Sequence, residues 1–84
     1  MEAKIGMIAK SAAGHDRGKY HVITALEGDF AYICDGKERK LSSPKKKRLK
    51  HLKFTNTVID TSILTDKKLR TILREYAKSM FPDT

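Results

Sequence analysis

Nine basic side chains between residues 37 and 53 form the densest group in this sequence that could bind a ligand. Cations this close repel one another unless counter-charges lie nearby, and the phosphates of a nucleic acid supply such charges. We therefore predict that this basic segment binds a polyanion and is more than a solvated surface. Its members are Lys37, Arg39, Lys40, Lys45, Lys46, Lys47, Arg48, Lys50 and Lys53.

A second candidate for ligand binding is the stretch of residues 11–19, here called the glycine loop. Gly14 and Gly18 stand among polar residues there, and glycine lets a backbone approach a ligand closely. His15, Arg17 and Lys19 could reach phosphates or bases. The spacing is neither that of a P-loop nor that of a dinucleotide-binding loop, so an ordinary hairpin loop is an equally good interpretation.

No group of residues indicates catalysis. His15 and Asp16 are adjacent, but no serine or cysteine stands in a recognisable partner motif. The histidines, His15, His21 and His51, lack the spacing of metal ligands, so we expect them at the surface or facing a nucleic acid. Cys34, the only cysteine, lies in an apolar run and is expected to be buried and unreactive. We therefore predict no enzyme, no metal site, no cofactor and no small-molecule substrate.

Length and charge narrow the class of protein further. The 84 residues suffice for one domain, spanning 1–84, and leave little room for a deep substrate cavity. The net charge of +8 attracts polyanions, of which nucleic acid is the commonest in a cell. No apolar run approaches the length that crosses a bilayer, and a single cysteine fits a reducing compartment. We expect a cytoplasmic protein without a membrane partner.

The apolar residues up to Phe54 fall in short runs that are typical of β-strands. Asp35 and Gly36 indicate a hairpin, because a type I′ turn needs residues that tolerate positive φ. Five short strands at this spacing favour a small barrel over about residues 5–54. Tyr20, Phe30 and Tyr32 are candidates for stacking on unpaired bases, but aromatic residues in small barrels more often lie in the core, and we expect these three there. The predicted strands are Ile5–Lys10, Tyr20–Leu26, Phe30–Asp35, Glu38–Leu41 and Arg48–Phe54.

The hydrophobic period changes after residue 55. Residues 55–64 read as a connection, and Thr65 and Asp66 then supply an N-cap hydroxyl and an acidic first turn for a helix over about 65–80. An apolar stripe recurs along that helix at the helical period. We predict that the helix docks this stripe on the barrel, and the stripe consists of Leu69, Ile72, Leu73, Tyr76 and Met80.

Part of the sequence resembles a known family. Gly6–Lys10 and Ala13–Ile23 look like the KOW motif, which has a strand, a loop with a characteristic glycine at the place of Gly14, and a second strand. The continuation through Phe30–Gly36, the basic segment and Leu49–Leu52 resembles the N-terminal domain of the fourteen-e large-subunit ribosomal proteins. The resemblance covers about Gly6–Phe54, and residues 56–84 have no counterpart in it.

This resemblance implies an SH3-like β-barrel that binds RNA without catalysis. The implied partner is ribosomal RNA of the large subunit or another structured RNA of the translation machinery, and no feature predicts an oligomer. The implied contacts are the loop residues Gly14, His15, Arg17, Gly18 and Lys19 together with the basic segment. The alternative is a protein-interaction module of a transcription or translation complex, since KOW and SH3-like barrels also bind proteins.

Overall fold

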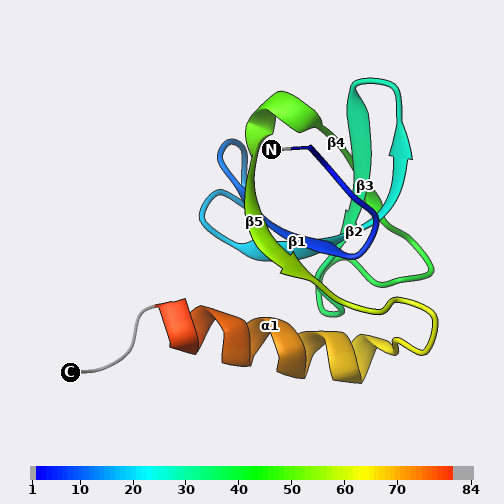
Figure 1. Ribbon diagram of the computed structural model, residues 1–84, viewed down its shortest axis with the longest axis vertical. Coiled ribbons are helices and arrows are strands. Elements are labelled where there is room, and N and C mark those ends of the chain that lie inside the picture. The colour runs from blue at the N-terminus through cyan, green and yellow to red at the C-terminus, as the bar shows by residue number, and fades with distance from the viewer. Residues whose placement is uncertain (1, 81–84) are drawn as a thin grey trace.

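A five-stranded antiparallel sheet with one C-terminal helix forms the computed structural model, which describes residues 2–80 (Figure 1). The strand order is β4-β3-β2-β1-β5, so β4 and β5 are the two edges and the ladder does not close on itself. The prediction of a mainly β domain with a C-terminal helix is confirmed. The elements are β1 (Met7–Ser11), β2 (Tyr20–Glu27), β3 (Phe30–Cys34), β4 (Lys45–Arg48), the 3₁₀ turn η1 (Leu49–His51), β5 (Leu52–Val58) and α1 (Asp66–Met80).

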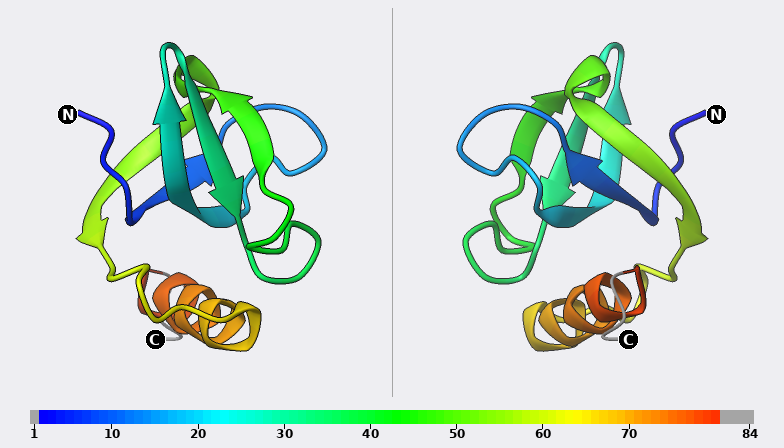
Figure 2. Two further views of the ribbon diagram at one scale, coloured as in Figure 1. Left: turned by 90° about the vertical axis from the view of Figure 1, so that its right-hand side faces the viewer. Right: turned by 90° about the vertical axis from the view of Figure 1, so that its left-hand side faces the viewer.

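Both faces of the sheet are buried over much of its central strands β1, β2 and β3. Neighbouring residues of a strand point to opposite faces, and β1 accordingly places Met7 and Ala9 in one apolar cluster and Ile8 in another. The sheet is curled, and α1 lies outside the curl (Figure 2). The second cluster joins Leu69 and Leu73 of α1 to the sheet, and the first cluster lies on the opposite face of the sheet, inside the curl. The three central strands β1, β2 and β3 therefore carry nearly continuous apolar runs, whereas the edge strand β4 is wholly basic. The first cluster also contains Ile23, Ala31, Ile33 and Leu52.

The helix begins and docks as the sequence predicts. The Thr65 hydroxyl accepts a hydrogen bond from the backbone N–H of Lys68 at 3.2 Å, which caps the first turn. Leu69 and Leu73 are buried against β1, β2 and β3 in the second cluster. Met80 is half exposed, so the buried stripe ends before it. No helix in the described part of the chain is long and apolar enough to cross a membrane.

The predicted hairpin strand Glu38–Leu41 is wrong. The Asp35 carboxylate accepts the backbone N–H groups of Lys37 and Arg39 at 2.9 and 2.8 Å, which folds this stretch into turns. The strand that pairs with β3 is β4, which aligns Phe30 with Arg48. Residues 35–44 are a loop, and the lysine-rich run itself is the edge strand.

Gly36 serves a different purpose from the predicted type I′ turn. It has a positive φ of +77°, and a Cβ there would collide with the backbone carbonyl of Asp66 at the start of α1. The Asp66 carboxylate accepts the N–H of Leu41 at 2.8 Å, and the Arg70 guanidinium donates to the Gly36 carbonyl at 2.7 Å. The loop and the first turns of the helix are therefore packed directly on each other.

Two other strand boundaries shift for local reasons. The first strand begins at Met7 and not at Ile5, because Gly6 adopts a φ of +90° and donates its N–H to the Ile23 carbonyl at 2.7 Å. The last strand begins at Leu52 and not at Arg48, because Leu49–His51 wind into the 3₁₀ turn. The predicted second strand, the turn at 28–29 and the buried position of Cys34 are confirmed.

Replacing Leu69 by alanine tests the docking of α1. The side chain is fully buried, so we expect the free energy of unfolding in urea to fall by about 2 to 5 kcal/mol. Lys68→Ala, at the exposed neighbouring position, is the control and should change it by less than about 0.5 kcal/mol. Equal midpoints for wild type and Leu69→Ala would contradict a docked helix.

Candidate nucleic-acid interface

The edge strand β4 sends its basic side chains to two different sides. Lys45 and Lys47 lie opposite Ile33 and Ala31, whose side chains belong to the apolar cluster inside the sheet. The intervening Lys46 and Arg48 point to the other face, beside the ring of Phe30. The lysine run is therefore not one surface, because the pleat of the strand divides it.

Lys47 forms a buried ion pair with the glycine loop. Its side chain is 7% exposed, and its Nζ lies 2.7 Å from Asp16 Oδ1 and 2.6 Å from the Ala13 carbonyl oxygen. Lys45 Nζ binds the other carboxylate oxygen of Asp16 at 3.1 Å. Gly14 lies against this pair with a φ of +85°, a backbone conformation that residues other than glycine rarely adopt. The loop is thereby fastened to the edge strand.

The charge state of Asp16 follows from this contact. Burial on its own would raise the pKa of the carboxyl group, but the hydrogen bonds and charges of Lys47 and Lys45 outweigh it and lower the pKa to about 2. Asp16 is therefore ionised at every physiological pH. Sequence reasoning assigned Lys45 and Lys47 to phosphates, whereas the structure holds both ammonium groups on Asp16.

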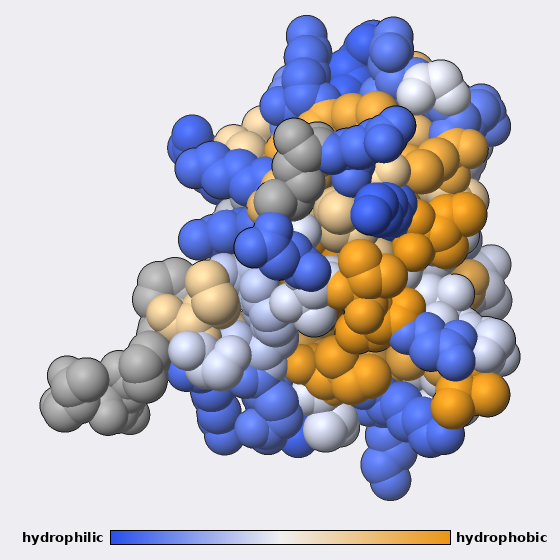
Figure 3. Space-filling model, viewed as in Figure 1, coloured by the Kyte–Doolittle hydropathy of each residue, from blue (hydrophilic) through white to orange (hydrophobic). Residues whose placement is uncertain are grey.

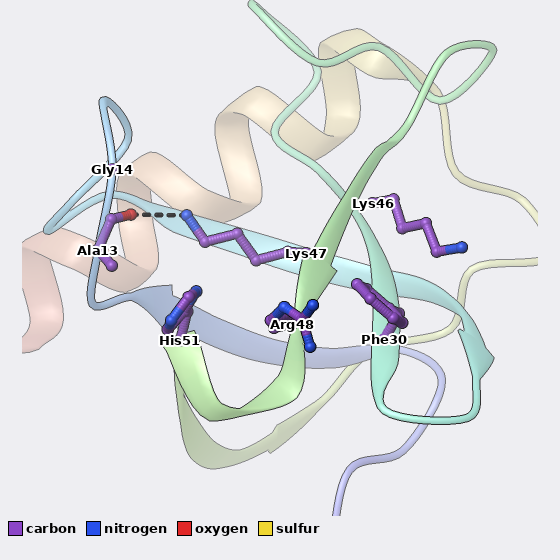
Figure 4. Close-up of a pocket in the computed structure, with 7 residues that line it drawn as sticks. All are labelled: Ala13, Gly14, Phe30, Lys46, Lys47, Arg48 and His51. Carbon is purple, nitrogen blue, oxygen red and sulfur yellow. Dashed lines mark hydrogen bonds between the residues drawn. The ribbon is translucent and has the colours of Figure 1, made fainter.

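A shallow pocket of about 360 Å³ lies on one side of the glycine loop (Figure 4). Phe30 lines it, with its ring centroid 4.6 Å from Lys46 Nζ and 5.0 Å from Arg48 Cζ. Phe30 and Tyr32 are only partly buried and belong to neither core cluster, so the prediction of a core position is wrong for both, whereas Tyr20 packs against the second cluster. We call this the Phe30 pocket, and it is lined by Ala13, Gly14, Phe30, Lys46, Lys47, Arg48 and His51.

A second pocket, of about 450 Å³, lies on the other side of the loop. Lys10 and Lys53 face each other across β1 and β5 there, and Arg17 adds a third cation. The Ser11 hydroxyl is buried and has no hydrogen-bond partner among residues 2–80. We call this the Ser11 pocket, and it is lined by Lys10, Ser11, Ala12, Arg17, Gly18 and Lys53.

Backbone hydrogen bonds hold the loop between the two pockets. The Ala12 N–H donates to the His51 carbonyl in η1 at 2.8 Å, and the Gly18 N–H donates to the Ser11 carbonyl at 2.8 Å. Within the described residues, the amides of 13–15 donate to no protein acceptor. The loop tip therefore presents free N–H donors between two cationic pockets, an arrangement that suits a phosphate group.

The remaining predicted contacts lie elsewhere. Lys19 pairs with Glu38 at 3.3 Å on the exposed surface. Lys37 lines a pocket beside α1 together with Arg70 and Arg74. The structure thus brings Gly14, Arg17, Gly18, Lys46, Arg48 and Lys53 to the two pockets beside the glycine loop, and it leaves His15, Lys19, Lys37, Arg39, Lys40 and Lys50 outside them.

Lys10, Phe30 and His51 line the pockets but were not among the predicted RNA contacts, although Phe30 was a candidate for stacking and His51 was expected at the surface or facing RNA. Lys10 joins the site because β1 pairs with β5 at Lys53, and pairing between distant strands has no local signal. Phe30 directly follows the turn at 28–29. Residues at the end of a hairpin often lie outside the core, and this is the sequence signal that could have placed Phe30 in the pocket. His51 lines the Phe30 pocket through the 3₁₀ turn, which was not predicted.

The histidines do not behave alike. His21 was expected at the surface, but it is 1% exposed and its Nδ1 lies 3.2 Å from the Lys19 carbonyl oxygen. Burial lowers the pKa of its imidazole, so the neutral ring is favoured. The prediction assumed that one face of β2 meets solvent. Both faces of β2 are covered at this point, so the side chain of His21 is buried as well. In the described part of the chain, no three His, Cys, Asp or Glu side chains lie close enough to hold a metal ion.

The pH dependence of stability tests the Asp16 contact. The folded pKa of about 2 lies below the ordinary value of 3.8, so the stabilisation is complete above about pH 4 and is lost as the pH falls through 2. We expect wild type to exceed Asp16→Asn in free energy of unfolding by about 2 kcal/mol at pH 6. The difference should shrink towards zero as the pH falls to about 2.

Glu38→Gln is the control for this measurement, because Glu38 forms an exposed pair with Lys19. Exposed pairs contribute about 0 to 1 kcal/mol, so this variant should stay close to wild type from pH 6 downwards. A difference between wild type and Asp16→Asn that stays constant from pH 6 to pH 2 would contradict the lowered pKa.

Comparison with known proteins adds no family to this description: no protein-family model matches the chain, and no curated protein matches its sequence. The resemblance to KOW proteins therefore stays a prediction from the residues that carry it.

Proposed function

We propose that this protein is a non-catalytic RNA-binding domain of the KOW type, and that its curled sheet is an SH3-like barrel. Three features support the barrel. The strands run antiparallel in the order β4-β3-β2-β1-β5, one 3₁₀ turn joins β4 to β5, and the sheet wraps around a single apolar cluster (Figure 2). A barrel of this kind leaves its loops and open edge for a partner.

The observation that carries the proposal is the glycine loop between two cationic pockets. Lys46 and Arg48 stand on one side of it, and Arg17 and Lys53 on the other. The pair of Asp16 with Lys47 holds the loop in place without a ligand. Lysine and arginine side chains neutralise phosphates, while the backbone N–H groups of residues 13–15 donate to one of them.

We propose structured RNA as the partner, and specifically ribosomal RNA of the large subunit, in the cytoplasm. A net charge of +8 on 84 residues supports a polyanion as the partner. The proposed contacts are those of the sequence resemblance that lie beside the loop, with Lys10 added: Lys10, Gly14, His15, Arg17, Gly18, Lys46, Arg48 and Lys53.

One observation favours the alternative of a protein-interaction module. Ile5, Val58 and Ile63 are each at least half exposed. Hydrophobic side chains gather over the end of β5 and the connection to α1 (Figure 3). Exposed apolar clusters mark protein contacts. This surface does not include the glycine loop, so the two functions can be separated by mutation.

Charge reversal beside the loop tests RNA binding. In Lys46→Glu/Arg48→Glu we expect binding of a labelled large-subunit rRNA fragment to weaken at least tenfold, with the slope of log affinity against log salt reduced by about 2. Lys67→Glu/Lys68→Glu, on the exposed start of α1, changes the net charge equally. This control should retain most of the affinity. An equal loss of affinity in both variants would mean that only the net charge matters, and it would contradict an interface beside the glycine loop.

Sedimentation of the tagged protein from a lysate tests the ribosomal partner. Co-migration with the large subunit at low salt, lost at raised salt and after ribonuclease treatment, is the expected result. Recovery at the top of the gradient under every condition, together with binding of the rRNA fragment, would keep the RNA-binding proposal and overturn the ribosomal one.

A further inference from the structure

Phe30 occupies an unusual position for an aromatic residue of a small β-domain. It begins β3 directly after the turn at 28–29, it is partly buried, and its ring forms one wall of the Phe30 pocket. Tyr32, two residues further along the same face, does not line this pocket, and its hydroxyl donates to Glu27 at 3.2 Å. The ring of Phe30 is therefore the aromatic surface that lines the Phe30 pocket, whereas Tyr20, directly after the glycine loop, packs edge-on against Tyr76 of α1.

Two cations share this one ring. Lys46 Nζ lies 4.6 Å and Arg48 Cζ 5.0 Å from its centroid (Figure 4). Each contact is weak at an exposed site, and two positive charges on one ring repel each other. The further partner of Lys46 is Glu27 at 3.3 Å, in a pair whose side chains are 45% and 64% exposed. The Lys46 ammonium is therefore easily displaced from the ring.

The Phe30 pocket has the chemistry of a nucleotide site. An aromatic ring and a guanidinium plane are the two surfaces on which unpaired bases stack. Gly14 and His51 form the opposite side of the pocket, and the amides of the loop tip lie next to it. The volume of about 360 Å³ falls at the lower end of pockets that bind small ligands.

Resting on the proposed function, we propose that this pocket holds one unpaired base of the RNA, stacked on the ring of Phe30. The base takes the place of the Lys46 ammonium, which turns to the phosphate of the same nucleotide, while Arg48 stays against the ring. The class of RNA recognised is then a helix with a bulged or looped-out nucleotide and not a continuous duplex, because a paired base cannot enter the pocket.

Stacking on a ring has a further consequence for sequence preference. Every base has a π-face, so this contact distinguishes unpaired from paired nucleotides without selecting one base. The cationic Ser11 pocket on the other side of the loop then serves the phosphates of the neighbouring helix.

A matched pair of RNAs tests the proposal: a short RNA duplex, and the same duplex carrying one bulged uridine. Wild type should bind the bulged RNA about tenfold more tightly. Phe30→Leu keeps an apolar side chain but removes the ring, so it should bind both RNAs with the affinity that wild type has for the plain duplex. Tyr32→Leu removes the neighbouring ring outside the pocket and should keep the preference of wild type.

Phe30→Trp provides a readout that does not depend on the folding of Phe30→Leu. The chain has no tryptophan, so the new indole is the only one in the protein. Its fluorescence should be quenched on adding the bulged RNA and nearly unchanged on adding the duplex at equal occupancy. Equal quenching by both RNAs would overturn base stacking.

The remaining outcomes separate this proposal from the function on which it rests. If wild type binds neither RNA, the proposed RNA-binding function fails together with the stacking site. If wild type binds duplex and bulged RNA equally, and Phe30→Leu does the same, RNA binding stands and the unpaired-base site is refuted.

Discussion

The buried ion pair between Asp16 and Lys47 is the contact on which the arrangement of the candidate site depends. It joins a loop between β1 and β2 to the outer strand β4, two parts of the chain separated by 31 positions. The free energy needed to remove two charges from water offsets much of the attraction between them, so the pair need not add much net stability. Its effect is positional, because it fixes the loop and thereby sets the walls of both pockets beside it.

The covering of both sheet faces explains why the candidate site lies at an edge. One face encloses an apolar cluster that includes Ile23 and Ile33, and the other is covered by α1 through Leu69 and Leu73. A ligand is therefore left with the loops, the strand ends and the outer face of the edge strand β4, where Lys46 and Arg48 are exposed. The glycine loop, η1 and β4 meet at such a place, and their backbone hydrogen bonds and the ion pair with Asp16 make it rigid.

Local sequence signals predicted much of this fold, whereas contacts between segments far apart in the sequence were missed. The helical period and the Thr65 cap identified α1, and β2 and its following turn were correct because their signals lie within the segment. The strand after Asp35 was misplaced, since its carboxylate binds nearby amides and creates turns that hydrophobic patterning does not reveal. The contacts of Lys47, Lys10 and Phe30 depend on which strands pair and in what register, and sequence spacing alone carries no such information.

The position of β4 at the edge of the sheet also bears on self-association. An unpaired strand edge is a template on which a second chain can add, and such addition leads to aggregation. Within residues 2–80, β4 pairs with β3 alone, and all four of its residues are cationic. Edge-to-edge pairing of two copies would bring two such strands together, and Asp16 and Glu27, which pair with Lys45, Lys46 and Lys47, offset part of this charge. The charges of β4, of which we assign Lys46 and Arg48 to RNA, are therefore also of the kind that keeps an exposed edge from forming intermolecular sheets.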